Sequence, residues 1–230
     1  MSRHLRVLIS AGPTRERIDP VRFLSNYSTG YMGACLAREA LKRGHRVTLV
    51  SGPTSVVPPR GASVMWVEQA QDMQAALRHH APKADVLIMA AAVCDFQPVH
   101  PMEKKLPRRG RFRLPLKSTP DIIATLPRRP GQLVVGFAVE TSHALVRAAT
   151  KLKAKRLDLI VGQRLNGRGS PFGDRAVKAF FIDACGRVTQ LGTISKPRLA
   201  RAILDEIEGL WYGGVQPRGV HAKEEVCATC

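Results

Sequence analysis

Short aliphatic runs, separated by stretches with helical periodicity, are the feature that most constrains how this chain can fold. Such runs occupy residues 5–10, 46–50, 63–67, 85–92, 133–138 and 157–161. Aromatic residues make up only 5% of the sequence, so the core must consist mainly of Val, Leu, Ile and Ala. Continuous aliphatic runs are typical of strands buried on both faces of a parallel sheet. The pattern therefore predicts an α/β fold with an open, doubly wound, mainly parallel sheet of the Rossmann-like kind.

The stretches between these runs predict crossover helices and the extent of the domain. Helices are expected at residues 32–43, 71–80, 143–155 and 197–210, with a short one from Asp121. Residues 177–183 and 187–191 flank an Ala-Cys-Gly turn and predict a C-terminal β-hairpin. Residues 11–30 are expected to form a long polar loop. We expect a single domain over residues 1–210, followed by a Gly-rich polar tail at 211–230 that is predicted to be disordered.

Residues 96–117 break the regular alternation of strands and helices. They contain prolines, a basic run and little apolar periodicity, which in a compact domain indicates a functional loop or flap. Residues 104–113 alone hold six cationic side chains. Such a flap could close over a triphosphate, exclude water and neutralise the charge of a leaving group. A solvent-exposed loop without function is the alternative interpretation.

The formal net charge of +18 predicts attraction to polyanions, although it is equally typical of a basic solvated surface. One alternative is therefore a basic nucleic-acid-binding α/β module. The basic run, however, contains only Phe112 as an interleaved aromatic residue, and no nucleic-acid-binding module is recognisable. We therefore expect small anionic ligands and no nucleic acid.

The cysteines and the hydropathy indicate a cytoplasmic protein without a membrane partner. The five cysteines are scattered and do not form a disulfide framework, and Cys227 and Cys230 lack a second pair to complete four zinc ligands. No stretch approaches the about 20 apolar residues that span a bilayer. The first residues run directly into a predicted strand, which leaves no room for a signal peptide.

Residues 28–33 combine two hydroxyl side chains with two glycines where a loop meets a predicted helix. Unpaired backbone N–H groups and the helix dipole favour a phosphate at such a position. Ser28, Gly30 and Gly33 are thus candidate nucleotide-binding residues, although these residue types also cap helices for structural reasons.

A nicotinamide-dependent dehydrogenase is a further alternative, and two absences argue against it. The second predicted strand ends in Ser-Gly-Pro, with no Asp or Glu to bind an adenosine ribose. None of the three tyrosines has a Lys four residues later, so the Tyr-Lys pair of short-chain dehydrogenases is missing.

Three further charged residues are candidates for ligand binding. Asp95 follows the most apolar predicted strand, and ligands of open α/β sheets bind at the carboxyl ends of strands. Its carboxylate could bind a base, a hydroxyl or Mg²⁺, or could simply cap the loop. Lys151 and Lys155 stand four residues apart and share one helix face. They could grip a phosphate, or they could merely suit the C-terminal end of the helix dipole.

Taken together, several segments resemble the phosphopantothenoylcysteine synthetase family. The opening signature, AGPTRERIDPVR at residues 11–22 followed by SNYSTGYMG at 25–33, is long and specific. Further matches follow in the order and spacing of the family at residues 90–95, 103–104, 119–122, 135–141, 151, 155 and 158–161. The resemblance covers roughly residues 5 to 208.

The resemblance implies a ligase of coenzyme A biosynthesis. Such enzymes activate the carboxylate of 4′-phosphopantothenate with a nucleotide, CTP in most bacteria, through an acyl-cytidylate that the amine of L-cysteine attacks; CMP and pyrophosphate are released. Mg²⁺ is expected on the phosphates, and the family forms homodimers. Its bacterial members are often fused behind a flavin-dependent decarboxylase. We expect this chain to perform the ligation alone, with a separate protein removing the carboxyl group of the cysteine moiety.

The resemblance also implies roles for individual residues. Asn26 matches the Asn that hydrogen-bonds the acyl-nucleotide, and Lys104 matches the catalytic Lys of a mobile flap, although a shift by one residue would place Lys105 there. The nucleotide pocket is matched by Asp95, Thr119, Pro120, Asp121, Ile122, Phe137, Lys151 and Lys155. The sequence departs from the family at Thr119, where Asn is usual, at Tyr31, where Lys is common, and at Gly162-Gln163, where Ala-Asn is common. No metal ligands are identified.

Overall fold

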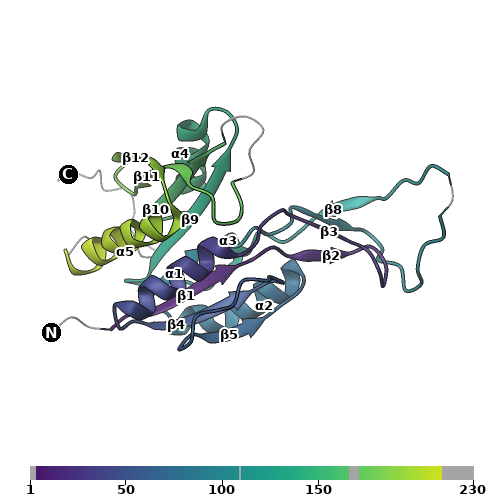
Figure 1. The fold of residues 1–230 in the computed structure, drawn as a ribbon, viewed down its shortest axis with the longest axis horizontal. Coiled ribbons are helices and arrows are strands. Elements are labelled where there is room, and N and C mark those ends of the chain that lie inside the picture. Colours follow the sequence, from purple (N-terminus) through teal and green to yellow (C-terminus); the bar gives the residue numbers. More distant parts are fainter. Residues whose placement is uncertain (1–3, 109, 166–170, 214–230) are drawn as a thin grey trace.

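A computed structural model describes residues 4–108, 110–165 and 171–213, and its centre is one eight-stranded sheet (Figure 1). The strand order is β12-β11-β10-β9-β6-β1-β4-β5. The strands are β1 (Arg6–Ala11), β4 (Arg46–Ser51), β5 (Ser63–Trp66), β6 (Val86–Met89), β9 (Leu133–Glu140), β10 (Leu159–Arg164), β11 (Val177–Asp183) and β12 (Val188–Ile194). Neighbouring strands from β5 to β10 pair in parallel, and β11 pairs antiparallel with both β10 and β12. The predicted mainly parallel sheet and C-terminal hairpin are confirmed.

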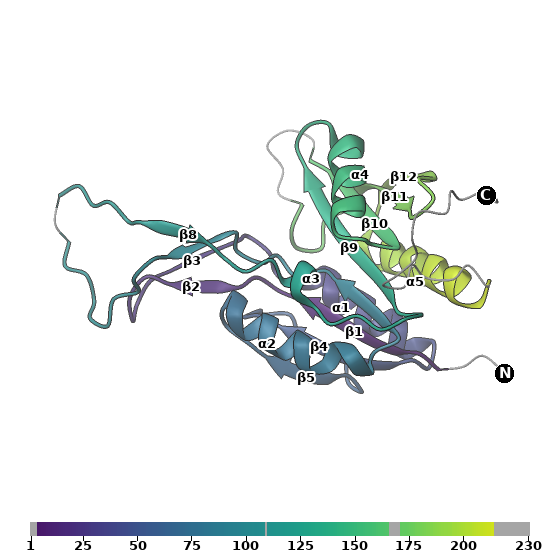
Figure 2. The same cartoon turned by 180° about the vertical axis from the view of Figure 1, so that it is seen from behind.

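Helices cover both faces of the sheet, as expected for a doubly wound fold. Helices α1 (Tyr31–Lys42) and α5 (Lys196–Tyr212) pack on the face seen in Figure 1. The opposite face, seen in Figure 2, carries α2 (Ala70–His80), α3 (Ile122–Thr125) and α4 (Ala144–Ala154), with a 3₁₀ turn at Ala81–Lys83. Both sides of β1 are therefore buried: Val7 and Ile9 face α1 and α5, and Leu8 faces α2. Among the described residues, no helix has the length and apolar character that crossing a bilayer requires.

Two short hairpins project together from the body of the molecule and form an arm (Figures 1 and 2). One hairpin pairs β2 (Arg15–Arg17) with β3 (Phe23–Ser25), and the other pairs β7 (Phe96–Pro98) with β8 (Leu116–Ser118). The arm comprises residues 15–25 and 96–118. The expectation of one long polar loop at residues 11–30 was therefore wrong, since this segment contains β2 and β3. The predicted flap at 96–117 forms the outer part of the arm.

The C-terminal boundary differs slightly from the expectation. Helix α5 continues to Tyr212, two residues beyond the predicted helix end, and Leu204 and Ile207 on this helix are fully buried. Residues 211 and 212 therefore belong to the last turn of this helix. Residues 214–230, including Cys227 and Cys230, lie outside the described residues.

Two glycines allow neighbouring elements to approach closely. An added Cβ at Gly33 in α1 would lie 2.4 Å from the Cβ of Ala11 in β1, so α1 could not pack at its present distance with a larger residue. An added Cβ at Gly162 in β10 would lie 2.1 Å from Cζ of Phe180, its partner in the register of β11. These positions thus require glycine for packing.

Replacement of Gly162 tests the tight contact between β10 and β11. We expect Gly162→Ala to lower the free energy of unfolding by about 1–3 kcal/mol, because the Phe180 ring must move in a packed layer. The matched control is Gly209→Ala in α5, where no atom lies within 4 Å of the added Cβ. This control should raise stability by about 0.5–1 kcal/mol, because alanine favours a helix interior. Urea unfolding of both variants measures the difference, and equal stabilities would contradict the packing account.

Candidate active site

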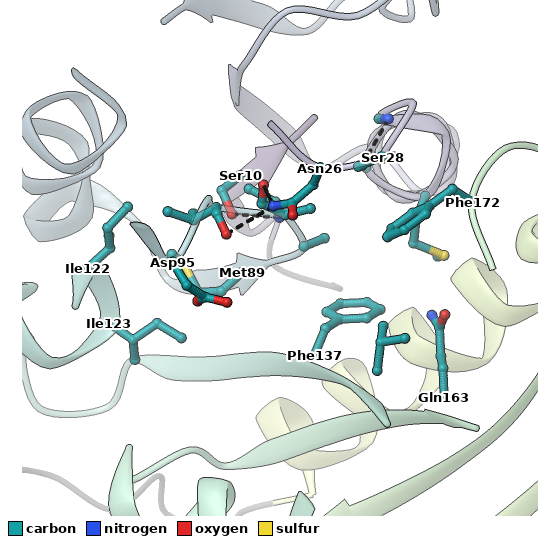
Figure 3. Close-up of a pocket in the computed structure, with 18 of the residues that line it drawn as sticks. Ser10, Asn26, Ser28, Met89, Asp95, Ile122, Ile123, Phe137, Gln163 and Phe172 are labelled. Atoms are coloured by element: carbon teal, nitrogen blue, oxygen red, sulfur yellow. Dashed lines mark hydrogen bonds between the residues drawn. The ribbon is translucent and has the colours of Figure 1, made fainter. Parts of the chain in front are cut away.

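A cavity of about 680 Å³ lies at the carboxyl edge of the parallel strands (Figure 3). It sits where strand order reverses, because the chain leaves β1 for β4 on one side and later returns to β6 on the other. Ligands of open α/β sheets bind at such a switch point. The cavity is lined by every predicted nucleotide residue and by one predicted catalytic residue: Asn26, Ser28, Gly30, Gly33, Asp95, Thr119, Pro120, Asp121, Ile122, Phe137, Lys151 and Lys155.

Asn26 follows β3 and ties the arm to the end of β6. Its amide nitrogen Nδ2 donates to the carbonyl oxygens of Ala92 and Val93, at 2.8 and 3.1 Å. Ser10 holds the same segment from β1, since its hydroxyl accepts a hydrogen bond from the amide of Ala91 at 3.1 Å. The amide group of Asn26 is therefore fixed in orientation at the cavity wall.

The segment that the sequence predicts as an anion cradle lies at the N-terminus of α1. Gly30 is the N-cap residue and has φ of 75°, which favours glycine. The hydroxyls of Ser28 and Thr29 accept hydrogen bonds from the amides of Gly30 and Tyr31, at 3.3 and 3.4 Å. The first turn contains no acidic residue to occupy the positive end of the helix dipole. At Gly33, by contrast, glycine is required because the close contact with Ala11 leaves no room for a side chain.

Lys151 and Lys155 reach the cavity from the C-terminal end of α4. The ammonium group of Lys151 donates to the carbonyl oxygen of Phe137 at 2.7 Å, and burial lowers the pKa of Lys151. Lys155 forms an ion pair with Asp121. The Asp121 carboxylate also caps α3 by accepting a hydrogen bond from the amide of Ala124 at 3.2 Å. A phosphate that enters the cavity would compete with Asp121 for Lys155.

Asp95 and Thr119 face each other across the base of the arm. The backbone amide of Thr119 donates to the carbonyl oxygen of Asp95 at 3.0 Å. The Thr119 hydroxyl donates to the carbonyl oxygen of Cys94 at 2.6 Å. Within the described part of the chain, no hydrogen bond reaches the carboxylate of Asp95, so the side chain does not cap the loop there. Among the described residues that line the cavity, Asp95 and Asp121 carry carboxylates, and Asp121 already binds Lys155. Asp95 is therefore the carboxylate available to a bound cation.

Gln163 and Lys196 also line the cavity, and neither was predicted as a site residue. Gln163 in β10 is only 5% exposed and points into the cavity (Figure 3), with no side-chain hydrogen bond to any described residue. Lys196 is 3% exposed and donates to the carbonyl oxygens of Pro171 and Gly173, at 2.7 and 2.6 Å. Burial lowers the pKa of Lys196. A lysine in the first turn of a helix opposes the helix dipole, which was an available signal in the sequence.

Lys104 is the predicted site residue that the structure does not bring to the cavity. It is exposed and lies on the arm, which extends away from the sheet (Figures 1 and 2). A flap closed over the cavity of its own chain is therefore not observed. No group of three or more His, Cys, Asp or Glu side chains within the described ranges could hold a metal ion by itself.

The fold and the cavity define an α/β protein with a cavity at the carboxyl edge of its sheet, lined in part by Lys151, Lys155 and Lys196. Residues 2–210 match the family model described as "DNA/pantothenate metabolism flavoprotein C-terminal domain", and the chain belongs to this family. This confirms the resemblance in the opening signature.

Individual relatives agree with this family. The chain is 43% identical over 209 residues to the coenzyme A biosynthesis bifunctional protein CoaBC of Bacillus subtilis. This alignment covers 89% of this chain and 51% of the relative. It is 40% identical over 206 residues to a cysteine/cysteine sulfinic acid decarboxylase of an unknown prokaryotic organism, covering 88% of this chain and 57% of the relative. The chain thus spans slightly more than half the length of these curated relatives.

The solved structures agree as well. A crystal structure of the C-terminal domain of a CoaBC protein superposes with a TM-score of 0.77 at 37% identity, covering 91% of this chain and 96% of that domain. The sheet and the flanking helices therefore have the arrangement of that domain.

Replacement of Lys151 tests the electrostatic cost of a buried cation in the cavity. We expect Lys151→Met to raise the free energy of unfolding at neutral pH by about 1 kcal/mol, because the loss of water around the ammonium outweighs its carbonyl hydrogen bond and its attraction to Glu140 and Asp95. The same change should weaken the binding of a triphosphate ligand, measured by calorimetry. Lys153→Met on the exposed side of α4 is the control and should change stability by less than about 0.5 kcal/mol.

The pH dependence of the stability gained by Lys151→Met follows from the lowered pKa of Lys151. Between that lowered value and the ordinary value of 10.5, the unfolded chain binds more protons than the folded protein, so the stability of the wild type rises with pH. The advantage of Lys151→Met should therefore be full below the lowered pKa and vanish as the pH approaches 10.5. A constant advantage across this window would contradict the account.

Proposed function

We propose that this protein is a ligase that joins 4′-phosphopantothenate to L-cysteine at the expense of CTP, through an acyl-cytidylate intermediate and with release of CMP and pyrophosphate. One observation carries the proposal: within a family whose curated relatives include coenzyme A biosynthesis proteins, the cavity gathers an anion cradle, two lysines and a fixed asparagine. Both phosphorylated substrates are anionic, so this cationic cleft also favours their capture.

The reaction needs alignment and charge stabilisation more than it needs a nucleophilic side chain. A carboxylate is a poor electrophile until one of its oxygens becomes part of a good leaving group, which a cytidylate ester supplies. The α1 N-terminus and Lys151 with Lys155 would hold the phosphates, and Asn26 would hydrogen-bond the acyl-nucleotide. Positioning of the substrate carboxylate against the α-phosphate, and later of the cysteine amine against the acyl group, would provide most of the acceleration.

Mg²⁺ is the cofactor that we propose for the phosphates. Mg²⁺ prefers oxygen ligands and is usually bound by one or two carboxylates together with substrate phosphates. Asp95 fits this requirement, because its carboxylate lines the cavity and no described residue hydrogen-bonds it. When bound, the ion would neutralise charge that develops on the leaving pyrophosphate.

The preference for CTP over ATP belongs to the proposal as well. Thr119 occupies the position where an Asn is usual in the family, and its hydroxyl already donates to the carbonyl oxygen of Cys94. Thr119 therefore offers the base no free hydroxyl proton. We expect base selection to rest on the shape of the pocket around Pro120 and Ile122 and on backbone groups.

A homodimer would bring Lys104 to a cavity. The arm exposes large apolar side chains, including Val21, Phe23, Phe96 and Leu116, which indicates a protein partner. A second copy with two-fold symmetry would cover this surface and place the Lys104 segment of each copy near the cavity of the other. We propose this arrangement because Lys104 does not line the cavity of its own chain.

The alternative of a basic nucleic-acid-binding module stays open as a prediction. The family and the cavity favour the ligase, but they do not test the affinity of the basic arm for a polyanion. We also propose a cytoplasmic location.

A pyrophosphate assay tests the reaction. We expect pyrophosphate release only when 4′-phosphopantothenate, Mg²⁺ and a nucleoside triphosphate are all present, and a higher kcat/KM with CTP than with ATP. Trapping without cysteine should accumulate the acyl-cytidylate, detectable by mass spectrometry. Release that is independent of phosphopantothenate would rule out the ligase, whereas a higher kcat/KM with ATP would overturn only the choice of nucleotide.

Two variants test the roles of Asn26 and Lys104. Asn26→Asp places a carboxylate against two carbonyl oxygens, and Lys104→Gln removes a cation, so each should lower kcat by about 10²-fold or more. Lys105→Gln is the matched control and should retain turnover; the reverse result would move the catalytic lysine to Lys105.

Mixing the two inactive variants then reports where Lys104 acts. If a site takes Asn26 from one chain and Lys104 from the other, random exchange of subunits should restore about a quarter of the sites. Restored turnover would confirm action across two copies. No recovery after verified subunit exchange would place both residues on one chain.

A further inference from the structure

A fully buried carboxylate lies in the arm, outside the cavity. Asp19 follows β2 in the turn of the first hairpin, and its side chain has 0% solvent exposure. One oxygen, Oδ1, accepts hydrogen bonds from the amides of Val21 and Arg22, both at 2.8 Å. The other oxygen, Oδ2, accepts from the Arg22 guanidinium, through Nε at 2.9 Å and through Nη2, and from the amide of Leu106 at 3.1 Å. This carboxylate therefore joins the two hairpins of the arm.

The segment that the Asp19 carboxylate holds contains Lys104. Leu106 is bound twice, because the Arg22 guanidinium also donates to its carbonyl oxygen at 2.9 Å. On the other side of Lys104, the amide of Met102 donates to the carbonyl oxygen of Ile18 at 2.9 Å. Both attachments lie two residues from Lys104, and both lead to the turn around Asp19. The backbone that carries Lys104 is thus a short bridge fixed at both ends.

The charge of Asp19 is central to this attachment. The hydrogen bonds from Arg22 hold the pKa of Asp19 well below its usual range, so the group is ionised throughout the physiological range. Charge-assisted hydrogen bonds to a carboxylate are stronger than neutral ones. An Asn in its place would keep one acceptor oxygen but would turn an NH₂ group toward donors of Arg22 or Leu106.

We propose that Asp19 is a positioning residue, which fixes the Lys104 segment through Leu106 and Arg22 at the geometry that nucleotide activation requires. This inference rests on the proposed function of Lys104. Asp19 does not line the cavity and acts through the backbone at Leu106. Small displacements of a reacting group can reduce rates by two orders of magnitude, so loosening one end of this bridge should affect the chemical step more than substrate binding.

The chain offers a matched control for a purely structural role. Asp183 lies at the turn between β11 and β12 and accepts hydrogen bonds from the amides of Cys185 and Arg187, at 3.0 and 2.9 Å. It also accepts from Nε of Arg187 at 2.9 Å. Asp183 thus makes the same kind of contacts as Asp19, but at the far edge of the sheet and without a connection to the arm.

The first measurement compares Asp19→Asn with Asp183→Asn. We expect Asp19→Asn to lower kcat by about 10- to 100-fold with little change in the KM for nucleotide, and Asp183→Asn to retain turnover. Thermal unfolding of both variants measures any general loss of stability. Limited trypsin digestion should show faster cleavage after Lys104 and Lys105 only in Asp19→Asn. Normal kcat in Asp19→Asn would overturn the proposal.

A double-mutant cycle with Lys104→Gln decides whether Asp19 acts through Lys104. If it does, adding Asp19→Asn to Lys104→Gln should cause no further loss of kcat. Effects that multiply would overturn the proposal, because Asp19 would then act independently. Normal turnover of Lys104→Gln alone would overturn both the role of Lys104 and this inference. Impaired Lys104→Gln beside a normal Asp19→Asn would overturn only the inference.

Discussion

The pairing of β1 with β6 is the constraint on which the site depends. The two strands are in register from Val7 opposite Val86 to Ser10 opposite Met89, and the contact continues beyond them, where the amide of Ala92 donates to the carbonyl oxygen of Gly12 at 2.9 Å. The chain then diverges, because residues after β1 enter the arm while those after β6 line the cavity. Asn26 closes this junction from the arm. A shift of β6 against β1 would therefore displace the cavity wall and the arm together.

The cavity concentrates cationic groups whose burial opposes folding. Lys151 and Lys196 are both largely removed from water, and burial lowers the pKa of each. Their partners are mainly carbonyl oxygens, at Phe137, Pro171 and Gly173, which do not neutralise a charge. Such an arrangement costs stability in the free protein, and an anionic ligand would recover it on binding. The electrostatics of the cavity therefore fit the anionic ligand that we propose.

The sheet and most of the cavity could be predicted because their signals are local. Buried parallel strands read as aliphatic runs, and ligands collect at their carboxyl ends, which brought residues such as Asp95 and Lys151 into one prediction. Strands β2 and β3 have only three residues each and form through pairing with one another, so no periodicity marks them. Gln163 interrupts an apolar strand, but its orientation into the cavity depends on the register of β9, β10 and β11. The segment around Lys104 is held by the turn around Asp19, which lies 85 residues earlier in the chain, so no local pattern could predict its position.

The arm separates two surface properties along its length. Apolar side chains such as Phe23, Phe96 and Leu116 are exposed near its strands, whereas the basic run at residues 104–113 lies in the loop between β7 and β8. Apolar contacts can hold a second copy without regard to charge, but the cationic loop would repel an equally basic surface. A bound polyanionic ligand would remove this repulsion. Association of the arm and occupation of the cavity by a nucleotide would then be thermodynamically coupled, each favouring the other to the same extent.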